Sequence, residues 1–253
     1  MAGPIGEGSA DQVRRAQLSE SLAAARARVA AAERAAGRPA GSARLMVVTK
    51  YFPARDMELL IELGAAEFGE NREPEAGRKV AQVREDRPES VFTVDMIGSL
   101  QRKKARTVAR WAHRVQSVDS AELVDALAAA ARSSLERGDR STPLGVLLQL
   151  SLDGDPRRGG AVAGALPALA DQVLAADGAL RLDGLMVIAP LNGEAGAHLA
   201  AAARVHEQFR ERYPQAVELS AGMSGDLEDA IANGSTCVRV GTAIMGPRPI
   251  LSP

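Results

Sequence analysis

The segment LMVVTKYFPARDMELLIELGAAEFGEN, residues 45–71, contains the pattern of a strand, a helix and a second strand in direct succession. An apolar run ends at Lys50, and residues 53–64 have the apolar spacing of a helix. A second short run then ends at Glu70 and Asn71. This order is typical of a βαβ unit, in which a crossover helix joins two parallel strands.

The same alternation continues along the rest of the chain. Strand candidates end near Lys50, Asn71, Gly98, Ser120, Leu152, Pro190, Ser224 and Gly246. Helical segments separate them at residues 53–64, 73–85, 101–111, 120–136, 160–176, 195–212 and 226–233. An Ala- and Arg-rich segment at 11–37 predicts one further helix ahead of the first strand.

Eight strands joined by seven helices favour a closed (β/α)8 barrel of the TIM type, in which the leading helix supplies the eighth outer position. An open doubly wound α/β sheet is the alternative. The chain has 253 residues, and barrels of that length commonly form one domain. We therefore expect a disordered tail at residues 1–10 and a single barrel domain at residues 11–250.

The composition argues against several classes of function. A net charge of -1 and an aromatic content of 3% predict no nucleic-acid-binding surface. The single cysteine, Cys237, excludes an internal disulfide and a multi-cysteine metal site, and no metal-ligand cluster or Ser–His–Asp arrangement stands out. No apolar stretch is long enough for a membrane span or a signal peptide, so we expect a cytoplasmic protein without membrane contact.

Polar residues occur in the last two strands, near the strand ends at which α/β proteins bind ligands. Alternation along the eighth strand places Arg239 and Gly241 on one face, and Glu218 and Ser220 alternate with apolar residues in the seventh. Arg239 would then point into the barrel, where an unpaired charge is costly. An anionic ligand would supply the missing partner.

Two neighbouring segments have the composition of a phosphate site. Ser224 and Gly225 precede a predicted helix, whose free N–H groups and dipole favour an anion. Gly241 and Thr242 follow the next strand, and the loops after strands seven and eight of a barrel often bind phosphate. Each segment also has a plainer interpretation, because Ser224 can cap its helix and Gly241 can turn the chain. Their adjacency in the barrel favours phosphate.

Lys50 ends the first strand, which neighbours the eighth in a closed barrel. A lysine among apolar strands can act as a nucleophile toward a carbonyl, although a strand-end lysine can also simply extend into solvent. Beside a phosphate site and an inward arginine, this lysine suggests a ligand with an aldehyde at one end and a phosphate at the other. Pyridoxal 5'-phosphate (PLP) has both groups, and its ring nitrogen needs a polar protein partner.

Eight short motifs, in order, resemble those of the pyridoxal phosphate homeostasis proteins (the YggS/PROSC family) over residues 15–247. They are VVTK (47–50), FGEN (68–71), IGSLQRKK (97–104), VQSVDS (115–120), LLQLSLDGDPRRGG (147–160), GLMVIAP (184–190), LSAGMSGDLEDAI (219–231) and VRVGTAIMG (238–246). The resemblance implies a barrel like the N-terminal domain of alanine racemase, with PLP held as a Schiff base, an aldimine, on Lys50.

The resemblance also implies roles for other residues. Ser224, Gly241 and Thr242 would hold the phosphate, Arg239 would face the pyridine nitrogen, and Asn71 and Met223 would lie near the ring. An arginine at the ring nitrogen keeps that nitrogen unprotonated, which makes the cofactor a poor electron sink. One departure is Asp95, which stands where the family usually has histidine.

These residues favour a holder of PLP over an enzyme. A racemase on this barrel needs a second acid/base group opposite the lysine. Tyr51 follows Lys50 directly, so strand alternation directs its side chain to the other face, and Tyr213 ends an outer helix. We therefore expect a monomeric PLP homeostasis protein that delivers the cofactor to apo-enzymes, without catalytic residues. The alternatives are a PLP-dependent amino-acid racemase of low activity and a barrel enzyme for a phosphorylated metabolite that binds no PLP.

A basic run opens the helix expected after the third strand. Its members are Arg102, Lys103, Lys104, Arg106 and Arg110. Helical spacing places the three arginines on one face. A solvated face is the plain interpretation, and a contact surface for a partner enzyme or a second PLP site is the alternative.

Overall fold

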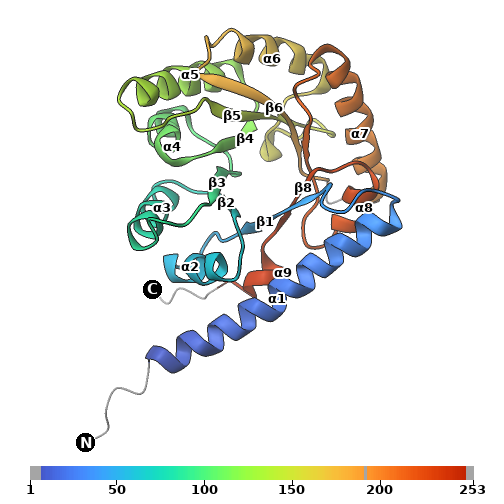
Figure 1. Ribbon diagram of the computed structural model, residues 1–253. Coiled ribbons are helices and arrows are strands. Elements are labelled where there is room, and N and C mark those ends of the chain that lie inside the picture. The colour runs from blue at the N-terminus through green and yellow to red at the C-terminus, as the bar shows by residue number, and fades with distance from the viewer. Residues whose placement is uncertain (1–6, 191–192, 249–253) are drawn as a thin grey trace, which may run out of the picture.

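The computed structural model describes residues 7–190 and 193–248, and a closed barrel of eight parallel strands forms its centre (Figure 1). The strands are β1 (Arg44–Val48), β2 (Glu67–Glu70), β3 (Thr93–Met96), β4 (Arg114–Val118), β5 (Leu144–Leu150), β6 (Leu180–Val187), β7 (Glu218–Ser220) and β8 (Cys237–Val240). Strand β1 pairs with both β2 and β8, which closes the sheet. The expected (β/α)8 barrel is confirmed, and the open sheet is excluded.

Helices cover the outside of the barrel, one after each strand (Figure 1). They are α1 (Glu7–Ala35), α2 (Ala54–Glu62), α3 (Glu75–Asp86), α4 (Ala105–Trp111), α5 (Ala121–Glu136), α6 (Leu166–Leu174), α7 (Ala195–Arg212), α8 (Leu227–Ala232) and α9 (Thr242–Met245), with 3-10 helices η1 (Arg102–Lys104), η2 (Pro156–Arg158) and η3 (Ala163–Ala165). Helix α5 shows why they pack this way, because Leu123, Leu127 and Ala131 recur every four residues and are buried.

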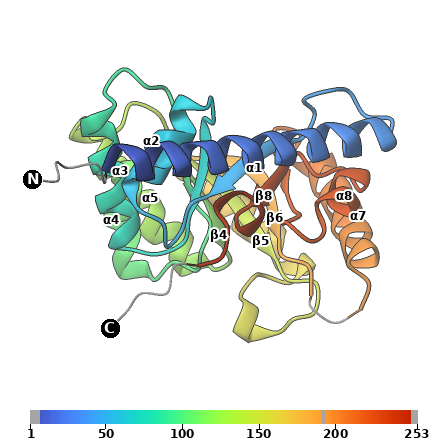
Figure 2. The ribbon, with the colours of Figure 1, turned by 90° about the horizontal axis from the view of Figure 1, so that it is seen from below.

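Helix α1 lies across the outside of the barrel and packs against α2, α8 and α9 (Figures 1 and 2). Its buried stripe includes Leu18, Leu22 and Val29, in the helical spacing expected from the sequence. The helix thus occupies the predicted outer position between α8 and α2, where it packs against the four-residue α9 that follows β8. It begins at Glu7, while residues 1–6 of the expected tail lie outside the described residues.

The end of the eighth strand differs from the prediction. The strand was expected to continue to near Gly246, but β8 ends at Val240. Residues 242–245 instead form α9, in which the N–H groups of Ile244 and Met245 both donate to the carbonyl of Gly241. The two side chains are buried at the base of α1, so their apolar character reflects helix packing rather than a strand.

Charged side chains fill the barrel interior at the amino ends of the strands. The set, called here the ion-pair layer, consists of Arg44, Glu67, Asp95, Arg114 and Glu218. The Nε of Arg114 donates to Oδ2 of Asp95 at 2.8 Å, and its Nη atoms lie 3.5 Å from Glu67 and 3.6 Å from Glu218. Arg44 pairs with both glutamates. Both cations of this layer, the buried Arg114 and the partly exposed Arg44, therefore have carboxylate partners.

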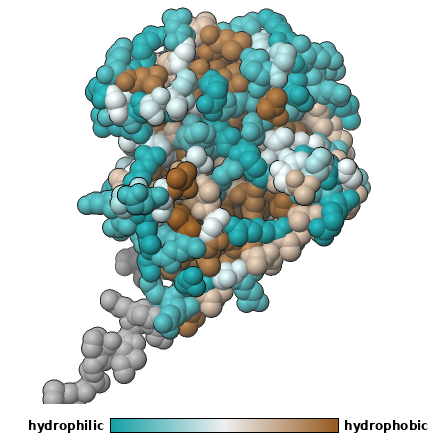
Figure 3. Space-filling model, in the orientation of Figure 1, coloured by the Kyte–Doolittle hydropathy of each residue, from teal (hydrophilic) through white to brown (hydrophobic). Residues whose placement is uncertain are grey.

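Hydrophilic side chains cover most of the face seen in Figure 3, and hydrophobic ones form separate patches. Across the two described ranges, none of the helices combines the length and the apolar character that a membrane span requires.

Candidate functional site

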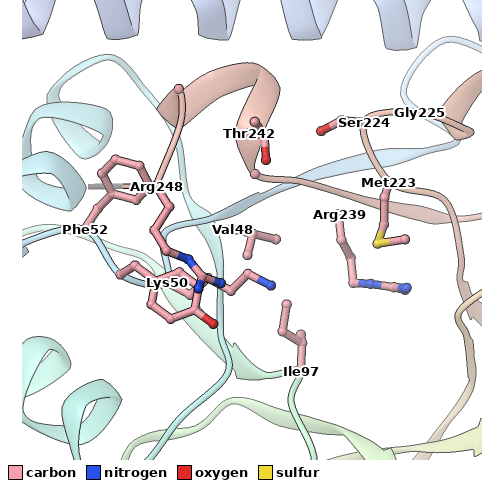
Figure 4. Close-up of a pocket in the computed structure, with 13 residues that line it drawn as sticks. Val48, Lys50, Phe52, Ile97, Met223, Ser224, Gly225, Arg239, Thr242 and Arg248 are labelled. Carbon is pink, nitrogen blue, oxygen red and sulfur yellow. The ribbon is translucent and has the colours of Figure 1, made fainter. Parts of the chain in front are cut away.

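A cavity of about 370 Å³ lies at the carboxyl end of the barrel (Figure 4). Its walls come from the segments that follow β1, β3, β7 and β8, and from the chain after α9. Six of the seven residues predicted from the sequence to bind a cofactor line it: Lys50, Met223, Ser224, Arg239, Gly241 and Thr242. The closed sheet brings them together, because it places β1 beside β8.

Lys50 supplies the amine of this cavity. It lies two residues beyond β1, in a turn, and its side chain points toward that of Arg239 (Figure 4). The Nζ of Lys79, by contrast, donates to Glu70 at 2.7 Å and to the carbonyl of Thr49 at 2.8 Å. The remaining lysines lie in η1, away from the cavity lining. Of the four lysines, only Lys50 therefore presents its amine to the cavity.

Arg239 is a buried cation with no acidic partner in the described part of the chain. Its side chain is 5% exposed. One Nη donates to the hydroxyl and the carbonyl of Ser220, both at 2.7 Å, and the other donates to the carbonyl of Val187 at 2.8 Å. Burial lowers the pKa of Arg239, but a guanidinium keeps its proton in proteins. The inward orientation expected from strand alternation is confirmed.

Hydroxyl and N–H groups gather on one side of the cavity. The hydroxyls of Ser224 and Thr242 lie on the same side in Figure 4. The backbone N–H groups of Ser224, Gly225 and Thr242 have no acceptor among the described residues. Helix α8 has six residues and α9 has four, so these donors, rather than a large helix dipole, would stabilise an anion. Ser224 does not cap α8, because Asp226 occupies the N-cap position.

Tyr51 is the main correction to the sequence analysis, which placed its side chain on the face away from Lys50. The residue has a φ of 71°, a left-handed conformation that strand alternation does not describe. Its ring lines the cavity, with the Nζ of Lys50 5.8 Å from the ring centroid. A hydrogen bond with Asn71 lowers the pKa of Tyr51, and the positive charge of Arg248 adds to the effect. Asn71 thus reaches the site through Tyr51 and is not itself part of the lining.

Arg248 was missed by the sequence analysis. Gly246, with a φ of 84°, turns the chain after α9 back over the cavity. The guanidinium carbon of Arg248 then lies 3.7 Å from the centroid of the Tyr51 ring. The cavity is consequently surrounded by Lys50, Arg239 and Arg248, and none of the described residues that line it is acidic.

Two members of the basic run, Arg102 and Arg110, line different hollows. Arg102 lies in η1, ahead of α4, and lines a shallow hollow with Ser120 and Glu122. Arg110 lies in α4 and lines a different hollow, with its Nε 3.6 Å from Asp139. The 3-10 helix η1 precedes α4 directly, and a common face of the three arginines stays a prediction.

Tyr213 lies on the outside of the barrel, as expected, and is not available to the cavity. Its hydroxyl lies 2.7 Å from Oδ1 of Asp171 and 3.0 Å from the carbonyl oxygen of Pro167, and burial raises the pKa of Tyr213 to about 12. Nowhere in the described ranges do three or more His, Cys, Asp or Glu side chains cluster in a way that could hold a metal ion.

The donor groups of the cavity fit PLP. A primary amine faces the interior, hydroxyl and N–H donors suited to a phosphate lie on one side, and a buried guanidinium lacks an anionic partner. The last feature is the most specific, because an unneutralised buried cation is costly without a ligand.

Comparisons with known proteins agree with this geometry. The profile of the family described as "Alanine racemase, N-terminal domain" matches residues 21–249. The chain is 44% identical to a pyridoxal phosphate homeostasis protein of Mycobacterium tuberculosis, covering 95% of this chain and 96% of that protein. It is 34% identical to the protein of the same name in Escherichia coli, covering 91% of this chain and 97% of that one.

Solved structures show the same relationship. PipY of Synechococcus elongatus, with PLP bound, has a TM-score of 0.73 at 30% identity and covers 90% of this chain and 100% of its own. Alanine racemase of Corynebacterium glutamicum has a TM-score of 0.63 at 15% identity, covering 94% of this chain and 62% of that enzyme. The second likeness concerns the fold alone.

Proposed function

This chain belongs to the family of pyridoxal phosphate homeostasis proteins, and we propose that it binds PLP in the cavity at the mouth of its barrel. Its function would be PLP homeostasis, as a holder and carrier of the cofactor rather than as an enzyme. The observation that carries the proposal is that Lys50 and Arg239 face one cavity whose described lining contains no carboxylate.

Each residue of the cavity has a defined task in this proposal. PLP supplies an aldehyde carbon that can bond covalently to a primary amine. The amine of Lys50 would form that carbon–nitrogen bond, with loss of water. Ser224, Gly241 and Thr242 would bind the phosphate through hydroxyl and N–H groups, at the side of the cavity where these donors gather.

The remaining residues would shape the contact with the ring. Arg239 would donate to the ring nitrogen from a position held by Ser220 and Val187. Met223 lines the same wall and would lie against the ring. Asn71 would act indirectly, because its hydrogen bond holds Tyr51 in the cavity.

A racemase of low activity is the second candidate, and the position of Tyr51 is the observation that favours it. Asn71 and the positive charge of Arg248 lower the pKa of Tyr51, which would make loss of its proton easier. Measured turnover therefore decides between the two candidates. Incubation of the PLP-loaded protein with single L-amino acids should produce no steady formation of D-isomers, and sustained turnover would contradict the carrier proposal.

The absorption spectrum tests the proposal directly. PLP added to the wild-type protein should give the band of a lysine-bound cofactor, and Lys50→Ala should remove that band. Lys103→Ala is a matched control, because Lys103 is an exposed lysine of η1 outside the cavity. Identical spectra for wild type and Lys50→Ala would reject the proposed site.

Delivery to apo-enzymes, a monomeric state and a cytoplasmic location stay predictions. The first is checked by mixing the loaded protein with an apo-enzyme that requires PLP and following the recovery of that enzyme's activity. Recovery at the rate set by free PLP alone would argue against direct delivery.

A further inference from the structure

A chain of hydrogen bonds runs from the cavity into the centre of the barrel. An Nη of Arg239 donates to Oγ of Ser220 at 2.7 Å, and that hydroxyl donates to Oε1 of Gln116 at 2.7 Å. The Nε2 of Gln116 then donates to Oδ2 of Asp95, also at 2.7 Å. Gln116 is 1% exposed, and Ser220 and Asp95 are fully buried. Three strands, β3, β4 and β7, thus support the one arginine that β8 presents to the cavity.

The direction of this chain is determined by its two ends. A guanidinium has only donors, so Ser220 must accept from Arg239. Oδ2 of Asp95 accepts from Arg114 as well as from Gln116, so the amide nitrogen of Gln116 must face Asp95. The amide oxygen is therefore left to face Ser220, whose hydroxyl proton points away from Arg239. Because its amide nitrogen is held by Asp95, Gln116 presents its amide oxygen to Ser220 as a hydrogen-bond acceptor.

Gln116 and Ser220 do not line the cavity, so a direct ligand contact does not explain them. A buried amide in a barrel costs free energy unless its hydrogen bonds are made, and an apolar side chain would fill the same space without that cost. Arginine has several rotatable bonds, and loss of the Ser220 acceptor would leave one Nη with the carbonyl of the same residue alone. The chain consequently restricts where the guanidinium of Arg239 can lie.

We propose that Gln116 is a positioning residue, which acts through Ser220 to aim the guanidinium of Arg239 at the ring nitrogen of the bound cofactor. The proposal rests on the proposed function, since it assumes that PLP occupies the cavity. It predicts that the site distinguishes ligands by the atom at the ring-nitrogen position, and that this discrimination depends on two side chains that no ligand touches.

The test compares PLP with its 1-deaza analogue, in which CH replaces the ring nitrogen. Both ligands carry the aldehyde and the phosphate, and the intrinsic difference between their aldehydes is the same for every variant. A change in the ratio of the two dissociation constants from one variant to another therefore reports the contact at the ring nitrogen. A lost hydrogen bond from a charged donor should make the wild-type protein bind the analogue about tenfold more weakly. Gln116→Met, which has similar volume, should reduce that ratio to about twofold, because Ser220 loses its acceptor.

Ser220→Ala interrupts the chain at a second point and leaves the contact between Gln116 and Asp95 intact. It should lower the ratio as Gln116→Met does, and it decides the question if the glutamine variant fails to fold. The double variant should lose no more than either single one, because residues in one network are not additive. Ser134→Ala is the matched control, since Ser134 is a fully buried serine of α5 whose hydroxyl has no partner in the described chain. Its ratio should equal that of wild type.

The outcomes separate the two proposals. A wild-type protein that binds neither ligand overturns the proposed function. A wild-type protein that binds both equally overturns the contact of Arg239 with the ring nitrogen, and with it the role of Gln116. A large wild-type ratio that persists in Ser220→Ala and Gln116→Met shows that the two residues serve stability alone.

Discussion

The two ends of the barrel interior differ in whether their arginines have carboxylate partners. In the ion-pair layer at the amino ends of the strands, Arg44 and Arg114 lie among Glu67, Asp95 and Glu218. At the mouth, Lys50, Arg239 and Arg248 surround a cavity whose described lining has no carboxylate. In the ion-pair layer, carboxylates of the protein neutralise the cations. At the mouth, Lys50, Arg239 and Arg248 have no such carboxylates, which indicates that a ligand supplies the negative charge there.

Arg239 is the clearest case within this comparison. It is as deeply buried as Arg114, but its partners are a hydroxyl and two carbonyl oxygens rather than carboxylates. Removing one member of a buried ion pair leaves the other charge buried and unpaired, which is strongly destabilising. We therefore expect removal of Arg114 to reduce mainly the stability of the protein, and removal of Arg239 to reduce mainly its affinity for the ligand.

The largest expected effect is on stability in Arg114→Met. This change leaves the buried Asp95 without its cation, while Glu67 and Glu218 keep Arg44, and breaking such a buried pair typically costs about 3–5 kcal/mol. Urea unfolding monitored by circular dichroism should show the loss. A variant as stable as wild type would mean that the ion-pair layer is not structural.

Arg239→Met should show the reverse behaviour. The free energy of unfolding of the ligand-free protein should fall by less than about 1 kcal/mol, because no carboxylate is left unpaired. The dissociation constant for PLP should rise about tenfold or more, since a hydrogen bond from a charged donor is lost. Titration of the apo-protein with PLP gives the second quantity. A stability loss equal to that of Arg114→Met would remove the distinction between the two ends.

Cys237 adds a pH-dependent contribution at the ion-pair layer. Burial raises the pKa of its thiol to about 11. The unfolded thiol releases its proton near pH 9 and the folded one near 11, so between these values the folded state binds more protons. The free energy of unfolding should therefore fall as the pH rises through this window, by about 2 kcal/mol for this group. Between pH 8.5 and pH 11, the free energy of unfolding of Cys237→Ala should fall by less than that of wild type. Equal decreases in both proteins would contradict a raised pKa of the Cys237 thiol.

The smallest effect is expected for Arg248→Ala. This arginine is exposed and stacks on Tyr51, and contacts of this kind contribute about 0.5–1 kcal/mol. The dissociation constant for PLP should rise about threefold at low salt, and the difference from wild type should vanish near 1 M salt because exposed charges are screened. The effect of Arg239→Met should persist at high salt, because Arg239 is buried. An equal salt response for both variants would contradict the contrast.

Alternation along the chain was enough to predict the barrel and most of the cavity. Strand ends meet at one face of a parallel barrel, so Lys50, Ser224 and Arg239 could be brought together without knowledge of any contact. Alternation fails where the backbone leaves the strand, which is why Tyr51, in a left-handed conformation, was placed on the wrong face. The chain after α9 was missed for the same reason.

The hydrogen bonds that connect Arg239 to Ser220, Gln116 and Asp95 could not be predicted from the sequence, for a different reason. Gln116 and Ser220 are 104 positions apart and meet only because both side chains point into the closed barrel. Each motif that contains them is compatible with an ordinary buried strand. Their shared role depends on the register of four strands, which local patterns do not specify.

The central claim is that one amine, that of Lys50, carries the cofactor. The direct measurement is borohydride reduction of the protein with PLP, followed by peptide mass spectrometry across its four lysines. We expect the reduced adduct on the peptide that contains Lys50 and on none that contains Lys79, Lys103 or Lys104. An adduct confined to another lysine, or a protein that acquires no mass at all, would contradict the account.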